Sequence, residues 1–288
     1  MTWWIGSVSG ASVDERCGTT AIISTMALRQ SILTKMGQTE NRNGQGAIEA
    51  VGLTRRFGDF VAVDSVTLRI PKGHLYGFLG LNGAGKTTTI RMLTTLLPPS
   101  EGTARLWGHD VVREPLAVRG LVGLVSDETS ESQWTWTARE YLSYFARIRH
   151  IRDASGQVER ILDDVGLDVR FRGKLIGTYS TGMKRRVEIA RALMGRPKVL
   201  FLDEPTRGLD LPAKRDMWNL LRRLAAEDQV TTFLSSHDAQ EVRSLCSEIS
   251  VIASGCIVYT GATVELGTDL DTFEERLIGL LTRQDRAA

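Results

Sequence analysis

The sequence lacks any run of about 18 or more apolar residues, the length that a membrane-spanning helix needs. It is also poor in cysteine: Cys17, Cys246 and Cys256 are odd in number and form no C-x-x-C pair, which argues against a disulfide framework and a zinc site. The net charge is only +2, because the chain has 36 basic and 34 acidic residues. No basic surface for nucleic acid is therefore expected. These absences favour a reducing, cytosolic setting, with any membrane role supplied by a partner.

Residues 1–46 differ in composition from the rest of the chain. They are rich in Gly, Ser, Thr, Asn and Gln, show no sustained periodicity, and lack the basic and apolar regions of a secretion signal. We expect a disordered or loosely packed N-terminal extension here, and Met26 or Met36 stays open as an alternative start. Residues 47–288 are expected to form one main domain.

From residue 48 onward, short apolar strands alternate with amphipathic helices. Strand-like runs at 63–70, 75–79 and 199–202 are separated by helical patterns, which predicts an α/β fold with a largely parallel sheet. Residues 137–180 carry apolar stripes at helical spacing. They predict a helical subdomain that interrupts the sheet domain.

A glycine-rich stretch at residues 80–87, Gly-Leu-Asn-Gly-Ala-Gly-Lys-Thr, lies between an apolar strand and a helix. Its glycines let backbone N–H groups face an anion, and the N-terminus of the helix adds positive charge. We predict an ATP site with Lys86 on the β- and γ-phosphates and Thr87 on Mg²⁺. The alternative is a glycine-rich turn with an exposed lysine. The predicted contact residues are Gly80, Asn82, Gly83, Ala84, Gly85, Lys86, Thr87 and Thr88.

A second apolar strand, at 199–202, ends in two adjacent carboxylates, Asp203 and Glu204. Ligands of parallel sheets bind at the carboxyl ends of the strands, where a bound cation can offset the charge of the carboxylates. We predict that Asp203 holds Mg²⁺, directly or through water, and that Glu204 is the general base for the attacking water. His237 follows the predicted strand at 231–235 and is expected at the same edge. Exposed acids at a strand end and a structural histidine are the alternatives.

Ser180 precedes a helix whose apolar residues share one face. It is predicted to be the N-cap, and Gly182 leaves backbone N–H groups of the first turn uncovered. The N-terminus of such a helix can hold a second anion. A capped helix with a solvated basic face at 184–186 is the alternative.

Taken in order, these motifs resemble those of the nucleotide-binding subunit of ATP-binding-cassette (ABC) transporters over about residues 48–280. Residues 80–87 match the phosphate loop, 179–183 look like the signature motif, 200–204 match the Mg²⁺ strand, 208–210 fall at the D-loop, and 236–237 match the switch histidine. The resemblance implies a phosphate-loop ATPase of ABC type, with a mixed sheet core, an antiparallel β subdomain and a helical subdomain. It also implies a head-to-tail dimer in which Ser180 and Gly182 act on the partner's ATP, and it places Asp210 at the nucleotide.

The same resemblance implies roles for three further side chains. Phe57 stands where the family has an aromatic ring that stacks on adenine, with a core phenylalanine as the alternative. His237 would contact the γ-phosphate. Asp127 stands where the family has a glutamine that contacts Mg²⁺, and this shorter residue is expected to reach the metal through water.

The signature variant and residues 134–140 look like those of the subfamily that pairs with small multispan permeases and exports drugs, antibiotics, lipids or glycans. The predicted function is therefore ATP hydrolysis that drives export through a separate permease. We expect a homodimer held through the permease at the inner face of the plasma membrane, with no nucleic-acid partner. An importer ATPase and a soluble ABC ATPase of translation or DNA repair are the alternatives.

Overall fold

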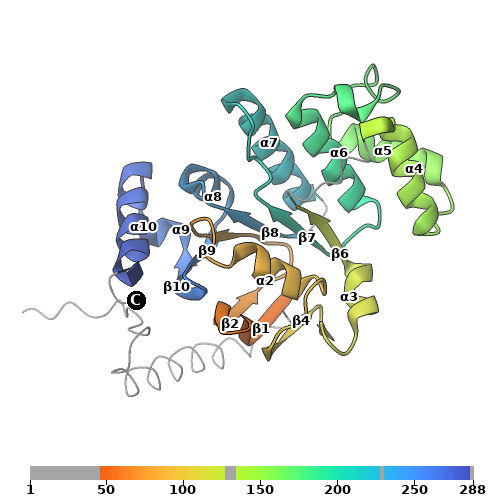
Figure 1. Cartoon of the computed structure of the whole chain (residues 1–288). Helices are drawn as coiled ribbons and strands as arrows, with labels where there is room; N and C mark the ends of the chain where they lie inside the picture. Colours follow the sequence, from red (N-terminus) through yellow and green to blue (C-terminus); the bar gives the residue numbers. More distant parts are fainter. Residues whose placement is uncertain (1–45, 127–133, 228–229, 286–288) are drawn as a thin grey trace, which may run out of the picture.

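The computed structural model describes residues 46–126, 134–227 and 230–285 (Figure 1). The expectation of a loosely packed N-terminal extension falls almost wholly outside these residues. None of the helices in these ranges combines the length and apolarity that crossing a membrane requires.

The central element is a six-stranded sheet with the order β10-β9-β3-β8-β7-β6. Its strands are β3 (Leu75–Leu79), β6 (Val122–Val125), β7 (Val199–Asp203), β8 (Thr231–Ser236), β9 (Glu248–Ala253) and β10 (Cys256–Ala262). All neighbouring pairs are parallel except β9 and β10, which are antiparallel. The predicted mixed, largely parallel sheet is confirmed.

Strand β7 shows why these sequences are apolar throughout. Val199 and Phe201 enter one apolar cluster, whereas Leu200 and Leu202 enter another on the opposite face of the sheet. Because both faces are covered, no position before the end of the strand can be polar without cost. The first charged residue, Asp203, therefore lies at the carboxyl edge.

A second, antiparallel sheet has the order β2-β1-β4-β5. Its strands are β1 (Ile48–Phe57), β2 (Phe60–Ile70), β4 (Glu101–Leu106) and β5 (His109–Asp110). Apolar residues of this sheet share a cluster with β3 and with α2 (Lys86–Leu93), which lies beside the antiparallel sheet in Figure 1. The helix that follows the phosphate loop is thus held by both sheets.

The helical subdomain contains α4 (Ala138–Ile148), α5 (Ala154–Asp164), the 3₁₀ turn η2 (Ile176–Thr178) and α6 (Thr181–Leu193). Helix α4 begins with a capping box formed by Thr137 and Glu140. The loop after α5 is anchored by the buried Arg172, which donates to Glu159 at 2.9 Å, to Asp163, and to the carbonyl of Leu167 at 2.9 Å. A buried guanidinium with several acceptors fixes this loop ahead of α6.

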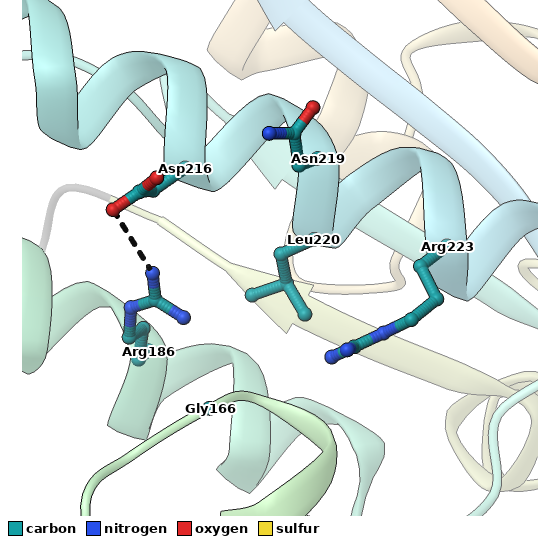
Figure 2. Close-up of a pocket in the computed structure, with 6 residues that line it drawn as sticks. All are labelled: Gly166, Arg186, Asp216, Asn219, Leu220 and Arg223. Atoms are coloured by element: carbon teal, nitrogen blue, oxygen red, sulfur yellow. Dashed lines mark ion pairs between the residues drawn. The ribbon is translucent and has the colours of Figure 1, made fainter.

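The remaining helices are α3 (Pro115–Leu121), α7 (Leu211–Glu227), α8 (Ala239–Leu245), α9 (Thr263–Leu266) and α10 (Leu270–Asp285). A cavity of about 410 Å³ lies between α6, α7 and the loop after α5 (Figure 2). Arg186 of α6 and Asp216 of α7 form an ion pair of 3.9 Å there. The lining residues are Gly166, Arg186, Asp216, Asn219, Leu220 and Arg223. None of them is a predicted nucleotide contact, so this cavity is separate from the predicted ATP site.

Candidate functional site

The phosphate loop connects β3 to α2, and its backbone requires glycine at several points. Gly85 has a φ of 106°, a conformation that residues with side chains rarely adopt. A Cβ on Gly80 would lie 2.4 Å from the carbonyl oxygen of Ile252. The loop can therefore approach β9 closely and still turn into the helix.

Lys86 points into the loop rather than into solvent. Its Nζ donates to the carbonyl oxygens of Gly80 at 2.8 Å and Leu81 at 3.2 Å, and lies 3.1 Å from Oε1 of Glu204. Only 6% of the residue is exposed. The alternative of an exposed lysine is wrong, and the buried cation gives the loop a fixed positive charge.

Asp203 accepts two hydroxyl hydrogen bonds at the end of β7. Thr87 Oγ1 donates to Oδ2 at 2.7 Å, and Ser235 Oγ donates to Oδ1. Ser235 was not among the residues predicted from sequence. The register of β8 against β7 places it directly beside Asp203, so the signal lies in strand pairing and not in a local motif.

Glu204 follows in a left-handed conformation, with a φ of 52°. Such a backbone is costly for a residue with a side chain and is typical of functional sites. Its carboxylate lies between two cationic or polar groups: Oε1 faces Lys86, and Oε2 is 2.7 Å from Nδ1 of His237. Oε1 is buried and has no aligned hydrogen-bond donor in the described part of the chain. The negative charge of this oxygen is offset by the Lys86 ammonium.

The other predicted contacts of the loop have mixed exposure. Asn82 and Gly83 are exposed at its tip, Thr88 is half-buried, and Ala84 is buried. Phe57 lies at the end of β1 and is 48% exposed, with the guanidinium of Arg55 4.7 Å from its ring centroid. The alternative of a core phenylalanine is wrong.

The signature residues lie away from the phosphate loop of the same chain. Ser180 accepts a hydrogen bond from the backbone N–H of Met183 at 3.3 Å, which confirms the predicted N-cap of α6. A Cβ on Gly182 would lie 3.7 Å from Cβ of Ala213, at the start of α7. Asp210 caps that helix by accepting from the N–H of Ala213 at 2.9 Å.

The signature residues and the phosphate loop lie at the N-termini of helices that pack on different elements. Helix α6 packs against β6, α4 and α5, whereas α2 packs against β2, β4 and β7. Within one chain the structure thus brings Ser180, Gly182 and Asp210 close to one another but not to Lys86. The alternative of a solvated basic face at residues 184–186 is wrong for Arg185, because this side chain is buried. Asp127 lies outside the described residues, and its role stays a prediction.

The glycine-rich loop around a buried lysine, together with the Asp203–Thr87 and Glu204–His237 pairs at the edge of a parallel sheet, defines a phosphate-loop nucleotide hydrolase. Lys86 can bind phosphate oxygens, and the carboxylates of Asp203 and Glu204 can bind a cation and a water molecule.

Comparison with known proteins narrows this class. Residues 63–207 match the family model described as ABC transporter. The chain is 39% identical over 233 residues to the daunorubicin/doxorubicin resistance ATP-binding protein DrrA of Streptomyces peucetius, covering 80% of this chain and 70% of that protein. It is 38% identical over 208 residues to the bacitracin transport ATP-binding protein BcrA of Bacillus licheniformis, covering 72% and 67%.

Solved structures show the same fold. The ABC transporter component cbiO1 of Clostridium perfringens has a TM-score of 0.72 and 25% identity, covering 82% of this chain and 93% of that one. The dimeric ATP-binding cassette MJ0796, bound to ADP and phosphate after hydrolysis, has a TM-score of 0.66 and 24% identity over 75% and 98%. The chain belongs to the ABC transporter family, and it is an ATP-binding ABC ATPase.

Replacement of Lys86 tests the phosphate loop. Lys86→Ala is expected to weaken ATP binding roughly a hundredfold or more, because the buried cation has no substitute in the loop. Equilibrium titration with a fluorescent ATP analogue measures the change. Lys174→Ala, which removes an exposed lysine above Phe171, is the matched control and should bind as the wild type does. Equal affinity of the two variants would contradict the assignment.

Proposed function

We propose that this chain is the ATP-hydrolysing subunit of an exporter, that it works as a head-to-tail dimer, and that a separate permease carries the transported molecule. The observation that supports hydrolysis most directly is the position of Glu204 between Lys86 and His237. Support for export comes from the relatives named for drug resistance and for bacitracin transport.

Glu204 is the proposed general base. Its Oε1 would take a proton from the attacking water, while the contact between Oε2 and His237 Nδ1 holds the carboxylate in place. Lys86 keeps the site neutral before nucleotide binds, since its Nζ lies 3.1 Å from the same carboxylate. Phosphate oxygens compete with Glu204 for this lysine, so binding of ATP frees the base.

Thr87 and Asp203 are the proposed holders of Mg²⁺. Both offer oxygen atoms, which this cation prefers, and Thr87 Oγ1 is already 2.7 Å from Oδ2 of Asp203. When bound, Mg²⁺ would offset negative charge on the β- and γ-phosphates. Asp127 is proposed to contribute through water from the segment that follows β6.

Glu204→Gln is expected to preserve ATP binding and to slow hydrolysis roughly a hundredfold or more, because an amide cannot accept the proton. Turnover of phosphate and nucleotide affinity are measured on the same preparation. Size-exclusion chromatography with ATP and Mg²⁺ should show a trapped dimer. Glu101→Gln, at an exposed glutamate of β4, is the control. Normal turnover by Glu204→Gln would remove Glu204 as the base.

A second copy is proposed to complete each ATP site. Ser180 and Gly182 present the N-terminus of α6 on the helical subdomain, apart from the phosphate loop of their own chain. A helix N-terminus favours phosphate, so its natural place is on the nucleotide of the partner. Asp210 and Phe57 are proposed to contribute at the same interface and at the adenine ring, respectively.

The permease is proposed to dock on aromatic residues of the helical subdomain. Trp134, Trp136 and Tyr144 are exposed there together with Ile148, and the rings of Trp136 and Tyr144 meet edge to face at 5.4 Å between centroids. Exposed apolar groups of this kind mark interaction surfaces. The docked permease would hold the chain at the inner face of the membrane.

The direction of transport is tested in cells that carry this chain with the permease encoded beside its gene. If the chain drives export, these cells should accumulate less daunorubicin or bacitracin than cells carrying Lys86→Ala. Cell-associated drug is measured by fluorescence or by a radioactive label. Greater accumulation with the active chain would indicate import and would contradict the proposal.

A further inference from the structure

Glu241 is a buried carboxyl group that the hydrolytic scheme does not use. It lies in the first turn of α8 and is only 1% exposed. Ser236 Oγ donates to its Oε2 at 2.6 Å, Trp218 Nε1 donates to its Oε1 at 3.2 Å, and the Thr206 side chain also hydrogen-bonds to it. Burial raises the pKa of the Glu241 carboxyl. Three partners from three segments therefore meet at one side chain.

The loop that carries His237 is fixed on both sides, by the side chain of Glu241 and by its backbone. On one side, the Ser236 hydroxyl donates to Glu241 and accepts from the backbone N–H of Asp238 at 3.0 Å. On the other, the backbone N–H of Glu241 donates to Oδ1 of Asp238 at 3.0 Å. The His237 side chain is 46% exposed and bonds to Glu204, and the two fixed neighbours set the position of its backbone.

Capping of α8 does not account for the Glu241 side chain. Asp238 is the N-cap and Glu241 the third helical residue, the position from which a glutamate can bond back to the N-cap N–H. That N–H is instead taken by Ser236 Oγ, and the Glu241 carboxyl turns to Ser236, Trp218 and Thr206. The side chain connects separate elements instead of closing its own helix.

The connected elements are those on which hydrolysis depends. Thr206 is two residues after Glu204, and Trp218 belongs to α7, whose N-terminus is capped by Asp210. One turn before Trp218, Lys214 forms an ion pair of 2.8 Å with Asp238. Two residues on one face of α7 are thus bonded to the segment that begins at His237. A movement of α7 must be passed to that segment.

We propose that Glu241 is a positioning residue that holds His237 against Glu204 and links the histidine to α7 and to the segment after the catalytic strand. It acts through His237 and does not touch the reacting atoms. This inference rests on the proposed function, because it assumes the roles given there to Glu204 and His237.

The test is a double-mutant cycle on the full-length chain, with Glu241→Met, His237→Ala and the combination of both. Glu241→Met should lower kcat roughly ten- to a hundredfold, the loss expected of a misplaced catalytic contact, while changing the ATP dissociation constant less than about twofold. In the His237→Ala background the same change should cause no further loss. Losses that multiply would show that Glu241 does not act through His237 and would overturn the proposal.

Two variants separate positioning from loss of stability. Leu224→Ala truncates a buried apolar side chain of α7 and removes none of the hydrogen bonds made by Glu241, so it should lower the melting temperature but preserve kcat. Glu241→Gln keeps one carbonyl oxygen for Trp218 and should recover most of the turnover lost in Glu241→Met. A fall in kcat for Leu224→Ala equal to that of Glu241→Met would overturn the proposal.

Ser236→Ala provides the same test without a change at Glu241, in case Glu241→Met does not fold. It removes the hydroxyl that connects the Glu241 carboxyl to the backbone N–H of Asp238, and it should also lower kcat without weakening ATP binding. Normal turnover would overturn the proposal. If His237→Ala itself hydrolyses ATP normally, the proposed role of the histidine fails. If His237→Ala is slow but Glu241→Met is not, only the positioning role fails.

Discussion

The ion pair between Lys86 and Glu204 is the contact on which the site depends. Each charge is expensive to bury alone, and the two come from different segments: the phosphate loop and the end of β7. The parallel order of β3, β8 and β7 brings these segments to one edge of the sheet. The apolar strands thus end where the paired charges begin, and the fold places the phosphate loop next to the proposed base, Glu204.

In the proposed dimer, one chain supplies only part of each ATP site. The phosphate loop and the carboxylates belong to the sheet domain, whereas Ser180 and Gly182 belong to the helical subdomain, whose helix α6 packs against β6. Glu241 connects α7 to the loop of His237, since it is bonded to Trp218 and to Ser236. A partner that moves α7 would therefore act on the histidine as well.

Local signals explain what the sequence predicted well. The phosphate loop, the carboxylates after β7 and the Ser180 cap each follow from neighbouring residues, and the strand-helix alternation predicted the class of sheet. Ser235 and Glu241 were missed because their roles arise from pairing with β7 and with α7, which a short stretch of sequence does not encode. The burial of Arg185 was missed for the same reason, since three adjacent basic residues read as a solvated face.

The central claim, that two copies complete each other's ATP sites, is tested most directly by mixing two inactive variants. Lys86→Ala damages the phosphate loop and Ser180→Arg damages the signature helix, so a mixed head-to-tail dimer has one doubly damaged site and one intact site. Equal mixing should leave about a quarter of all sites intact, and ATP hydrolysis should return when the two proteins are combined. If the mixture stays as inactive as either variant alone, Lys86 and Ser180 serve the same chain and the account is contradicted.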